Sequence, residues 1–298
     1  MLLDLTVGWY LTACAVSKEL SVLTINVRQT VEKIQELRLN HHEQEILDWL
    51  SAPNPSVNYE NALEKRHKGT GKWFIDGRAF ADWKKQPNSF LWLHGLPGCG
   101  KTVLSSTIIE HLRNSAKSAH VPLYFYFDFT DTHKQTFEDM LRSLVRQLYR
   151  GQPDSRRPLE KLRESPNESN RQLSKTSLKG VFLAMLSEVD NVSIVLDALD
   201  ESTTRSELLA WLQGILKAGS CECRVLVTAR REQDIESAFQ CWTRSEDRIS
   251  IRGNEVDRDI RSYVRHTVCN SKGLSKWRKM PEVLREIGTE LMNRADGM

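Results

Sequence analysis

The 298-residue chain lacks the features that would place it in several specialised classes of protein. Its 42 basic and 39 acidic residues leave a net charge of +3, so the composition gives no case for a nucleic-acid-binding surface. The six cysteines have no paired spacing that suggests a disulfide framework, and reduced thiols are the simpler interpretation. No run of eighteen apolar residues occurs, which predicts no membrane span.

The N-terminus also lacks the positive charge of a secretory signal, because Asp4 stands in that region. We therefore expect a cytoplasmic protein. Hydrophobic residues make up 40% of the chain, which is enough for a real core, and 27% are charged. At this length the chain can form one large α/β domain with smaller helical additions.

A glycine-rich segment predicts a nucleotide site. It has the form G-x-x-x-x-G-K-[ST] and consists of Gly95, Leu96, Pro97, Gly98, Cys99, Gly100, Lys101 and Thr102. An apolar run at 90–93 precedes it and a helical pattern follows, which is the context that a phosphate-binding loop requires. The backbone N–H groups would surround a phosphate, Lys101 would reach the β- and γ-phosphates, and the Thr102 hydroxyl would ligate Mg²⁺. A glycine-rich turn that binds nothing is the weaker interpretation.

From residue 90 onwards, strand and helix patterns alternate, which predicts a three-layer α/β fold with a mostly parallel sheet. The expected strands are 90–93, 123–129, 192–196, 224–228 and 248–251. Helices are expected between them, one of them capped by Thr136, and also near 255–268 and 281–294. The polar segment 151–173 predicts an exposed loop.

The region before the glycine-rich segment divides into two parts. Residues 18–50 predict an amphipathic helix whose apolar stripe consists of Leu20, Leu23, Val27, Val31, Ile34 and Leu37. Residues 51–56 predict a linker, and the aromatic side chains that follow are expected to pack in the core rather than to hold a base. The expected domains are an N-terminal helical segment (1–50), a linker and aromatic segment (51–89), the nucleotide domain (90–251) and a partial helical subdomain (252–298).

Acidic residues follow the strand at 192–196. A carboxylate at the end of a buried strand lies at the carboxyl edge of the sheet, where such folds bind ligands. Asp197 would therefore hold Mg²⁺, directly or through water, and Asp200 or Glu201 could orient or activate an attacking water. The alternative is an acidic helix N-cap, which is common after a strand.

A third polar cluster ends the strand at 224–228. Arg230 could contact the γ-phosphate there and distinguish a bound triphosphate from a diphosphate. A surface arginine at the end of a strand is an equally good interpretation of the spacing alone.

Together these segments resemble the NACHT NTPases of the STAND class, in particular the fungal NOD-like-receptor proteins, whose NTPase region is also described as a nephrocystin-like N-terminal domain. The resemblance extends over roughly residues 45–298 and is carried by 46–51, 71–83, 90–102, 126–131, 196–201, 227–230, 259–264 and 295–298. It implies a signalling switch that binds ATP or ADP with Mg²⁺, GTP being the alternative. It also implies slow hydrolysis, with Lys101 and Thr102 binding phosphate and Mg²⁺, Asp197 supporting the metal, Asp200 and Glu201 as catalytic candidates, and Arg230 as the sensor.

The resemblance further implies self-association, or association with related receptors, in fungal self/non-self recognition. The chain contains only part of the helical subdomain that such proteins carry, and no recognisable effector domain precedes residue 45. The alternative function is therefore a truncated, non-hydrolysing module that acts as a decoy or regulator of full-length relatives. Hydrolysis itself stays undecided at the level of sequence.

Overall fold

The computed structural model describes residues 33, 38, 41–115, 120–165, 173–219, 222–252, 254–270, 272–277 and 280–295. The chain divides into two compact units, Met1–Ser51 and Ala52–Met298. In the first unit, residues 41–50 form a helix, and the apolar stripe expected at 20–37 lies outside the described residues. Within the described ranges, every helix is too short or too polar to cross a lipid bilayer.

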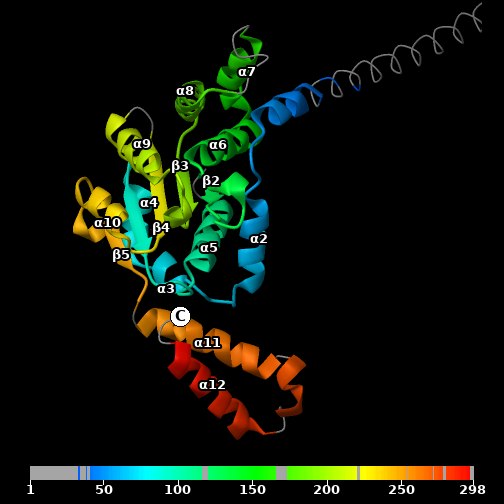
Figure 1. Cartoon of the computed structure of the whole chain (residues 1–298), viewed down its shortest axis with the longest axis vertical. Coiled ribbons are helices and arrows are strands. Elements are labelled where there is room, and N and C mark those ends of the chain that lie inside the picture. Colours follow the sequence, from blue (N-terminus) through cyan, green and yellow to red (C-terminus); the bar gives the residue numbers. More distant parts are fainter. Residues whose placement is uncertain are drawn as a thin grey trace, which may run out of the picture. The chain divides into compact units, whose positions relative to one another are not determined.

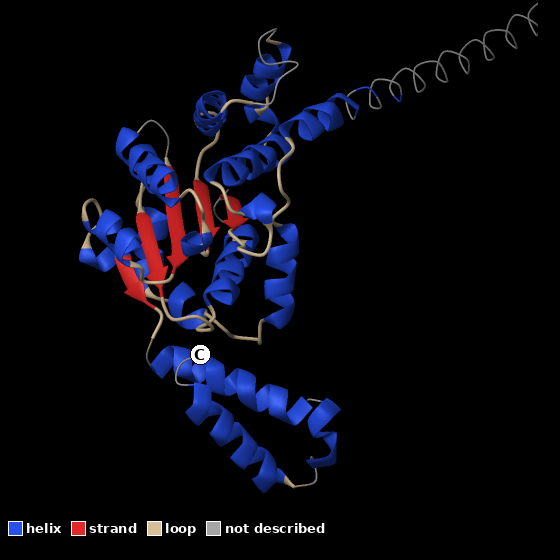
Figure 2. Cartoon of the chain, viewed as in Figure 1, coloured by secondary structure: helices blue, strands red, loops and turns tan. Residues whose placement is uncertain are grey.

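The second unit contains a five-stranded parallel sheet (Figures 1 and 2). Its strands are β1 (Phe90–His94), β2 (Val121–Tyr126), β3 (Val192–Asp197), β4 (Cys223–Ala229) and β5 (Arg248–Ser250), in the spatial order β2-β3-β4-β1-β5. The predicted mostly parallel sheet is confirmed. The strand expected at 123–129 ends earlier, because the Asp128 carboxylate accepts hydrogen bonds from the backbone and hydroxyl of Thr130 and turns the chain.

The helices of this unit are α2 (Ser56–Lys65), α3 (Lys72–Ile75), α4 (Arg78–Lys85), α5 (Lys101–Asn114), α6 (Phe137–Gly151), α7 (Arg157–Glu164), α8 (Lys175–Leu186), α9 (Arg205–Ala218), α10 (Gln233–Gln240), α11 (Asn254–Asn270) and α12 (Pro281–Ala295). The predicted cap of α6 is confirmed, since Thr136 and Asp139 form a reciprocal capping box. The linker expected at 51–56 has no regular structure over 51–55, and α2 begins at Ser56, with Tyr59 and Ala62 buried.

Helices cover both faces of the sheet and complete three layers. On one face, Leu93 of β1, Val195 of β3 and Leu226 of β4 pack in a core cluster with α5, α4 and α2. The aromatic residues ahead of the loop belong to this cluster, as expected for core packing: Phe74, Phe80 and Trp83 are buried in it. On the other face, aromatic rings link the sheet to α10 through Phe90, Trp92 and Phe239.

The edge strand β2 is protected by a side chain of α6. The Gln147 side chain accepts a hydrogen bond from the backbone N–H of Tyr124 (3.0 Å) and donates one to the Tyr124 carbonyl (2.8 Å). These two bonds satisfy backbone groups that a neighbouring strand would otherwise pair with. They therefore make this edge of the sheet less able to associate with a strand of another chain.

The exposed loop predicted over 151–173 is wrong where it includes α7. Leu159 is 0% exposed and anchors this helix, although most of its neighbours in sequence are charged. Arg156 fixes the approach to the helix, because its Nε donates to the Tyr149 carbonyl (2.7 Å) and its guanidinium lies over the Tyr149 ring. The high polarity reflects a short amphipathic helix with one buried side, and residues 166–172 lie outside the described residues.

Candidate phosphate-loop site

The glycine-rich loop connects the carboxyl end of β1 to the first residue of α5. Gly98 and Gly100 have φ angles of +80° and +88°, a backbone region that side chains with a Cβ atom rarely adopt. Gly95 is required for space instead, because a Cβ atom there would lie 2.6 Å from Cys99 Sγ. Cys99 is buried beneath the loop, while Leu96, Pro97 and Gly98 face solvent. The loop thus presents its backbone at the carboxyl edge of the sheet.

Lys101 is held on the loop itself. Its Nζ donates hydrogen bonds to the carbonyl oxygens of Gly95 (2.9 Å) and Leu96 (2.8 Å). The ammonium group therefore lies over the loop, within reach of any anion that the backbone N–H groups would surround.

Asp197 is the centre of the site's polar network. Its carboxylate accepts hydrogen bonds from three hydroxyl groups, those of Thr102 (2.7 Å), Ser105 (2.6 Å) and Thr228 (2.7 Å). The strand order brings these groups together: Thr102 and Ser105 lie on α5, and Thr228 lies near the end of β4, which separates β1 from β3. Burial raises the pKa of Asp197, and the three hydroxyl bonds together with Lys101 oppose that rise.

The donor chemistry around Asp197 fits Mg²⁺. A hydroxyl and a carboxylate are hard oxygen ligands, and magnesium sites that hold nucleotides typically use only one or two protein carboxylates. Among the described residues, no group of three or more His, Cys, Asp or Glu side chains lies where it could hold a metal ion. Ser105 and Thr228 did not emerge from the sequence motifs, although Ser105 lies three residues after Thr102 and so on the same face of α5.

Asp200 and Arg230 form a pair across the ends of β3 and β4. One carboxylate oxygen of Asp200 accepts the backbone N–H of Arg230 (2.9 Å), and the other lies 3.1 Å from Arg230 Nε. The Asp200 side chain is 3% exposed, while the Arg230 side chain is 46% exposed. Arg205 adds a hydrogen bond from its guanidinium to the Asp200 carbonyl (2.7 Å). Asp200 therefore anchors Arg230 and leaves the guanidinium accessible.

Glu201 lies on the opposite side of the same turn. Its carboxylate accepts the backbone N–H of Phe129 (3.0 Å), and burial raises its pKa. Phe129 is 67% exposed and was not singled out from the sequence. The turn between the acids passes through Ala198, whose φ of +54° lies in the left-handed region, so the chain is strained where it directs Asp200 and Glu201 to different partners.

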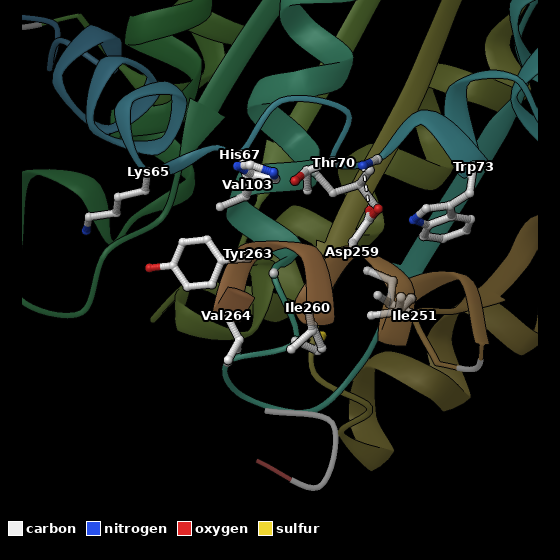
Figure 3. Close-up of a pocket in the computed structure, with 16 residues that line it drawn as sticks. Lys65, His67, Thr70, Trp73, Val103, Ile251, Asp259, Ile260, Tyr263 and Val264 are labelled. Atoms are coloured by element: carbon white, nitrogen blue, oxygen red, sulfur yellow. Dashed lines mark hydrogen bonds between the residues drawn. The ribbon is translucent and has the colours of Figure 1, made fainter. Parts of the chain in front are cut away.

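A cavity of about 340 Å³ adjoins the loop (Figure 3). The loop itself contributes Gly98, Cys99 and Gly100, the segment between α2 and α3 contributes His67, Thr70 and Gly71, and α11 contributes Val256, Asp259, Ile260, Tyr263 and Val264. A hydrogen bond joins two of these segments, because Asp259 accepts the backbone N–H of Gly71 (2.7 Å). The His67 and His266 rings join them again, with centroids 4.7 Å apart.

Comparison with known proteins finds similarity to a curated protein and to a number of solved structures, two of which are given below. The vegetative incompatibility protein HET-E-1 of Podospora anserina is 25% identical over 209 residues, which are 66% of this chain and 15% of that protein. The chain thus spans only a small part of the length of this relative.

The ORC1 protein of Aeropyrum pernix in complex with DNA superposes with a TM-score of 0.40 and 15% identity, over 82% of this chain and 62% of that one. The structure of Drosophila ORC bound to DNA superposes with a TM-score of 0.41 and 11% identity, over 80% of this chain and 55% of that one. At this level of overlap, neither structure bears on the fold or the ligands of this chain.

The family model described as Nephrocystin 3, N-terminal matches residues 69–230. The match begins two residues before Gly71, includes the whole glycine-rich loop and Asp197, and ends at Arg230. Because it covers more than half of the chain, and because the loop, the buried acid and the parallel sheet agree with it, the chain belongs to the Nephrocystin 3, N-terminal family and is a NACHT-like P-loop NTPase domain.

Proposed function

We propose that this domain binds ATP with Mg²⁺ in the glycine-rich loop, hydrolyses it slowly and serves as a nucleotide-dependent switch in signalling. The observation that carries the proposal is the hydrogen bond between Thr102 and the buried Asp197 at the start of α5, directly after the loop. Burying a carboxylate costs free energy unless hydrogen bonds compensate for the lost water. Here three hydroxyl groups donate to the Asp197 carboxylate and hold it next to a helix N-terminus.

Three residues would bind the phosphates and the metal. Lys101 exchanges its two carbonyl acceptors for phosphate oxygens, a stronger set because both partners are then charged. The Thr102 hydroxyl and the Asp197 carboxylate would hold Mg²⁺, Asp197 directly or through water. When bound, Mg²⁺ neutralises negative charge on the phosphates.

Glu201 is the better of the two acidic candidates for orienting the attacking water. Asp200 is engaged on both oxygens with Arg230, which suits a positioning role. Glu201 accepts a hydrogen bond from the Phe129 backbone N–H, and its raised pKa brings it closer to the range of a general base. Arg230 keeps an accessible guanidinium, which supports a contact with the γ-phosphate.

The base and ribose would occupy the cavity next to the loop. A volume of about 340 Å³ lies at the lower end of the range of small-molecule sites, and most of its lining side chains are apolar. Val103, Leu104 and Ile260 supply flat contact area for a purine, and the Asp259–Gly71 bond fixes the segment opposite. Adenine is our first choice, with guanine as the alternative that the experiment distinguishes.

A signalling role rests on the relationship to the vegetative incompatibility protein HET-E-1. We infer a function in fungal self/non-self recognition, exerted in the cytoplasm through self-association or association with related receptors. One observation favours a binding-only alternative: the carboxylates of Asp200 and Glu201 both have protein partners, so the site can bind nucleotide without turning it over and act on longer relatives as a decoy.

The first experiment identifies the nucleotide that copurifies with the chain, by denaturing the protein and separating the released ligand by chromatography. Calorimetric titration with Mg·ATP, Mg·ADP and Mg·GTP follows, together with a phosphate-release assay. We expect Lys101→Ala to weaken binding about 100-fold, equivalent to about 2.7 kcal/mol. Lys217→Ala, on an exposed position of α9, should leave it unchanged.

The outcomes separate the two functions. Tight binding with measurable phosphate release supports the hydrolysing switch, and tight binding without release supports the decoy. A folded chain that takes up no nucleotide, or a Lys101→Ala variant with wild-type affinity, would refute the proposed site.

A further inference from the structure

A second polar cluster lies at the opposite edge of the sheet and serves no role in the nucleotide site. It consists of His120, Ser193 and Arg224, which we call the amino-edge cluster. Within the described ranges, seven buried side-chain nitrogen or oxygen atoms have no hydrogen-bond partner, and four of them belong to this cluster: His120 Nδ1, Ser193 Oγ, and Arg224 Nε and Nη1. The remaining three belong to Trp92, Tyr126 and Trp211, with one atom each.

The topology of the sheet brings the cluster together. Ser193 in β3 and Arg224 in β4 are direct partners in the parallel ladder, so their side chains point to the same face of the sheet. His120 immediately precedes β2, whose Pro122 is the ladder partner of Ser193 on the other side. The cluster thus lies across the amino ends of three adjacent strands, whereas the phosphate loop follows the carboxyl end of β1 (Figure 2).

The arginine is the unusual member. Arg224 is only 5% exposed, and it forms no ion pair or hydrogen bond through Nε or Nη1 with any described residue. Removing a guanidinium from water without a counter-charge is costly, so buried arginines normally have carboxylate or phosphate partners. Buried donors left without partners indicate either solvent or a ligand that the protein does not itself supply.

The surroundings favour an anion. The charged groups that act on His120 are Arg224 of β4, Lys84 of α4 and His111 of α5, and each of them lowers the His120 pKa, as does burial, the largest cause. No acidic side chain is among these influences. A hydrogen bond with the Asn191 backbone opposes this lowering. The positive charge of the cluster therefore resides on Arg224, and the charged groups that act on His120 are basic.

We propose that the amino-edge cluster binds an oxyanion of the phosphate class, at a site separate from the phosphate loop. The guanidinium carries a full positive charge, and its Nε and Nη1 donors have no partner among the described residues, so each can donate to an oxyanion oxygen. The Ser193 hydroxyl adds a third donor, and His120 adds a fourth when Nδ1 is protonated. The bound anion is either free phosphate or the phosphate group of a larger molecule.

The test measures the thermal unfolding of the full chain as inorganic phosphate is added, against chloride at equal ionic strength. The phosphate loop could also take up this probe, so the titration is repeated in Lys101→Ala. We expect phosphate to raise the melting temperature in both chains. In Ser193→Ala, a small change at a buried position, the concentration needed for half the shift should rise at least tenfold.

Arg224→Met should abolish the shift, and Arg224→Lys, which keeps the charge without the planar donors, should weaken it. Arg150→Met makes the same change of charge on an exposed position of α6 and should behave as wild type. If Arg224→Met does not fold, Ser193→Ala and Arg224→Lys still decide the question. Phenyl phosphate serves as a second probe: a comparable shift assigns the site to phosphate groups of larger molecules, and a shift with inorganic phosphate alone assigns it to the free ion.

Three results would overturn the proposal. One is a phosphate effect that disappears in Lys101→Ala, because the loop would then be the only oxyanion site. Another is an effect that survives unchanged in both Ser193→Ala and Arg224→Lys. The third is no effect beyond that of chloride with either probe, which would mean that water alone solvates Arg224.

Discussion

The two edges of the parallel sheet differ in whether their buried charged side chains have hydrogen-bond partners. At the carboxyl edge, Asp197 accepts three hydroxyl bonds and Asp200 holds the backbone and side chain of Arg230. At the amino edge, Arg224 is just as buried, yet two of its nitrogen atoms have no partner among the described residues.

The difference follows from what each edge receives from its helices. Helix N-termini at the carboxyl edge supply N–H groups and capping hydroxyls, which stabilise carboxylates. Helix C-termini at the amino edge supply carbonyl oxygens and a partial negative charge, which tolerate a cation but do not provide a full counter-ion. The carboxyl edge therefore holds its acids with its own donors and must exchange partners when a ligand binds. At the amino edge, donors of Arg224 have no acceptor among the described residues.

The largest effect should come from removing the central charge of the carboxyl edge. In Asp197→Asn, we expect Mg²⁺-dependent nucleotide affinity to fall about 100-fold, because the amide is a poor ligand for Mg²⁺. The free energy of unfolding of the nucleotide-free chain should not fall, since the amide oxygen still accepts hydroxyl bonds and a buried charge is lost. Calorimetry with and without EDTA, and urea unfolding, measure the two quantities. Asp190→Asn, at an exposed position, is the control.

The same carboxylate predicts a dependence on pH. Burial raises the pKa of Asp197, so the folded chain holds this proton more tightly than the unfolded chain. The protonation of Asp197 therefore stabilises the fold most below the pKa that Asp197 has in the unfolded chain. This stabilisation is lost as the pH rises through the pKa that Asp197 has in the folded chain. Nucleotide affinity in the presence of Mg²⁺ should change in the opposite direction and weaken as the pH falls through the same window. An affinity that is independent of pH there would exclude Asp197 from the metal site.

A smaller effect should follow from breaking the Asp200–Arg230 pair. Asp200→Ala leaves the partly buried N–H of Arg230 without its acceptor, and we expect the free energy of unfolding to fall by about 2 kcal/mol. Asp234→Ala removes an exposed carboxylate that pairs with Arg205, and it should reduce stability by less than about 1 kcal/mol. Equal losses in urea unfolding would show that burial of the Asp200 pair contributes nothing.

Glu201→Gln tests whether the carboxyl edge turns over nucleotide or only binds it. We expect the rate of phosphate release to fall at least about 100-fold, the lower end of the range for a lost general base, with nucleotide affinity within about threefold of wild type. Glu188→Gln, at an exposed position near the end of α8, is the control. If release continues at the wild-type rate, Glu201 does not orient the water.

The Asp259–Gly71 bond should contribute about tenfold to affinity. A hydrogen bond to a charged group is worth about 1.5 kcal/mol, and this one fixes a segment that lines the cavity next to the loop. We therefore expect Asp259→Ala to weaken Mg·ADP binding by about that factor, measured by calorimetry. The nearby residue Asp257 does not line the cavity, so Asp257→Ala should leave Mg·ADP binding unchanged. Equal affinity for the two variants would contradict a nucleotide in this cavity.

The smallest effect concerns backbone strain at the acidic turn. Ala198 has a left-handed backbone conformation that glycine adopts more easily, so Ala198→Gly should stabilise the chain by about 0.5–1 kcal/mol. Ala184→Gly is the control with the opposite sign, because it lies within α8 and should destabilise by about 1 kcal/mol. Thermal unfolding compares the two, and a loss of stability in Ala198→Gly would mean that the turn is not strained.

Much of the fold is encoded locally and could be read from the sequence. The alternation of apolar runs and helical spacings gave the parallel sheet, and the capping residue Thr136 marked the start of α6. The failures were also local in origin. α7 was missed because only Leu159 is buried in it, and the two leucines of this short helix, Leu159 and Leu162, make too weak a helical period among its charged residues.

The candidate site was encoded only in part. The sequence by itself singled out the loop at 95–102 and the carboxylate at 197 as candidates, because a phosphate-binding loop and a metal-supporting acid would need particular residues at fixed local spacing. It could not rank Asp200 against Glu201, since both follow the same strand and their roles depend on which partner each side chain reaches.

The tertiary structure alone decided those partners. The order β2-β3-β4-β1-β5 puts β4 between the loop strand and the acidic strand, which brings Thr228 to Asp197 and Arg230 to Asp200. The same order aligns Ser193 with Arg224 at the other edge. Contacts between residues far apart in the chain depend on strand order and register, and short-range periodicity carries no information about either.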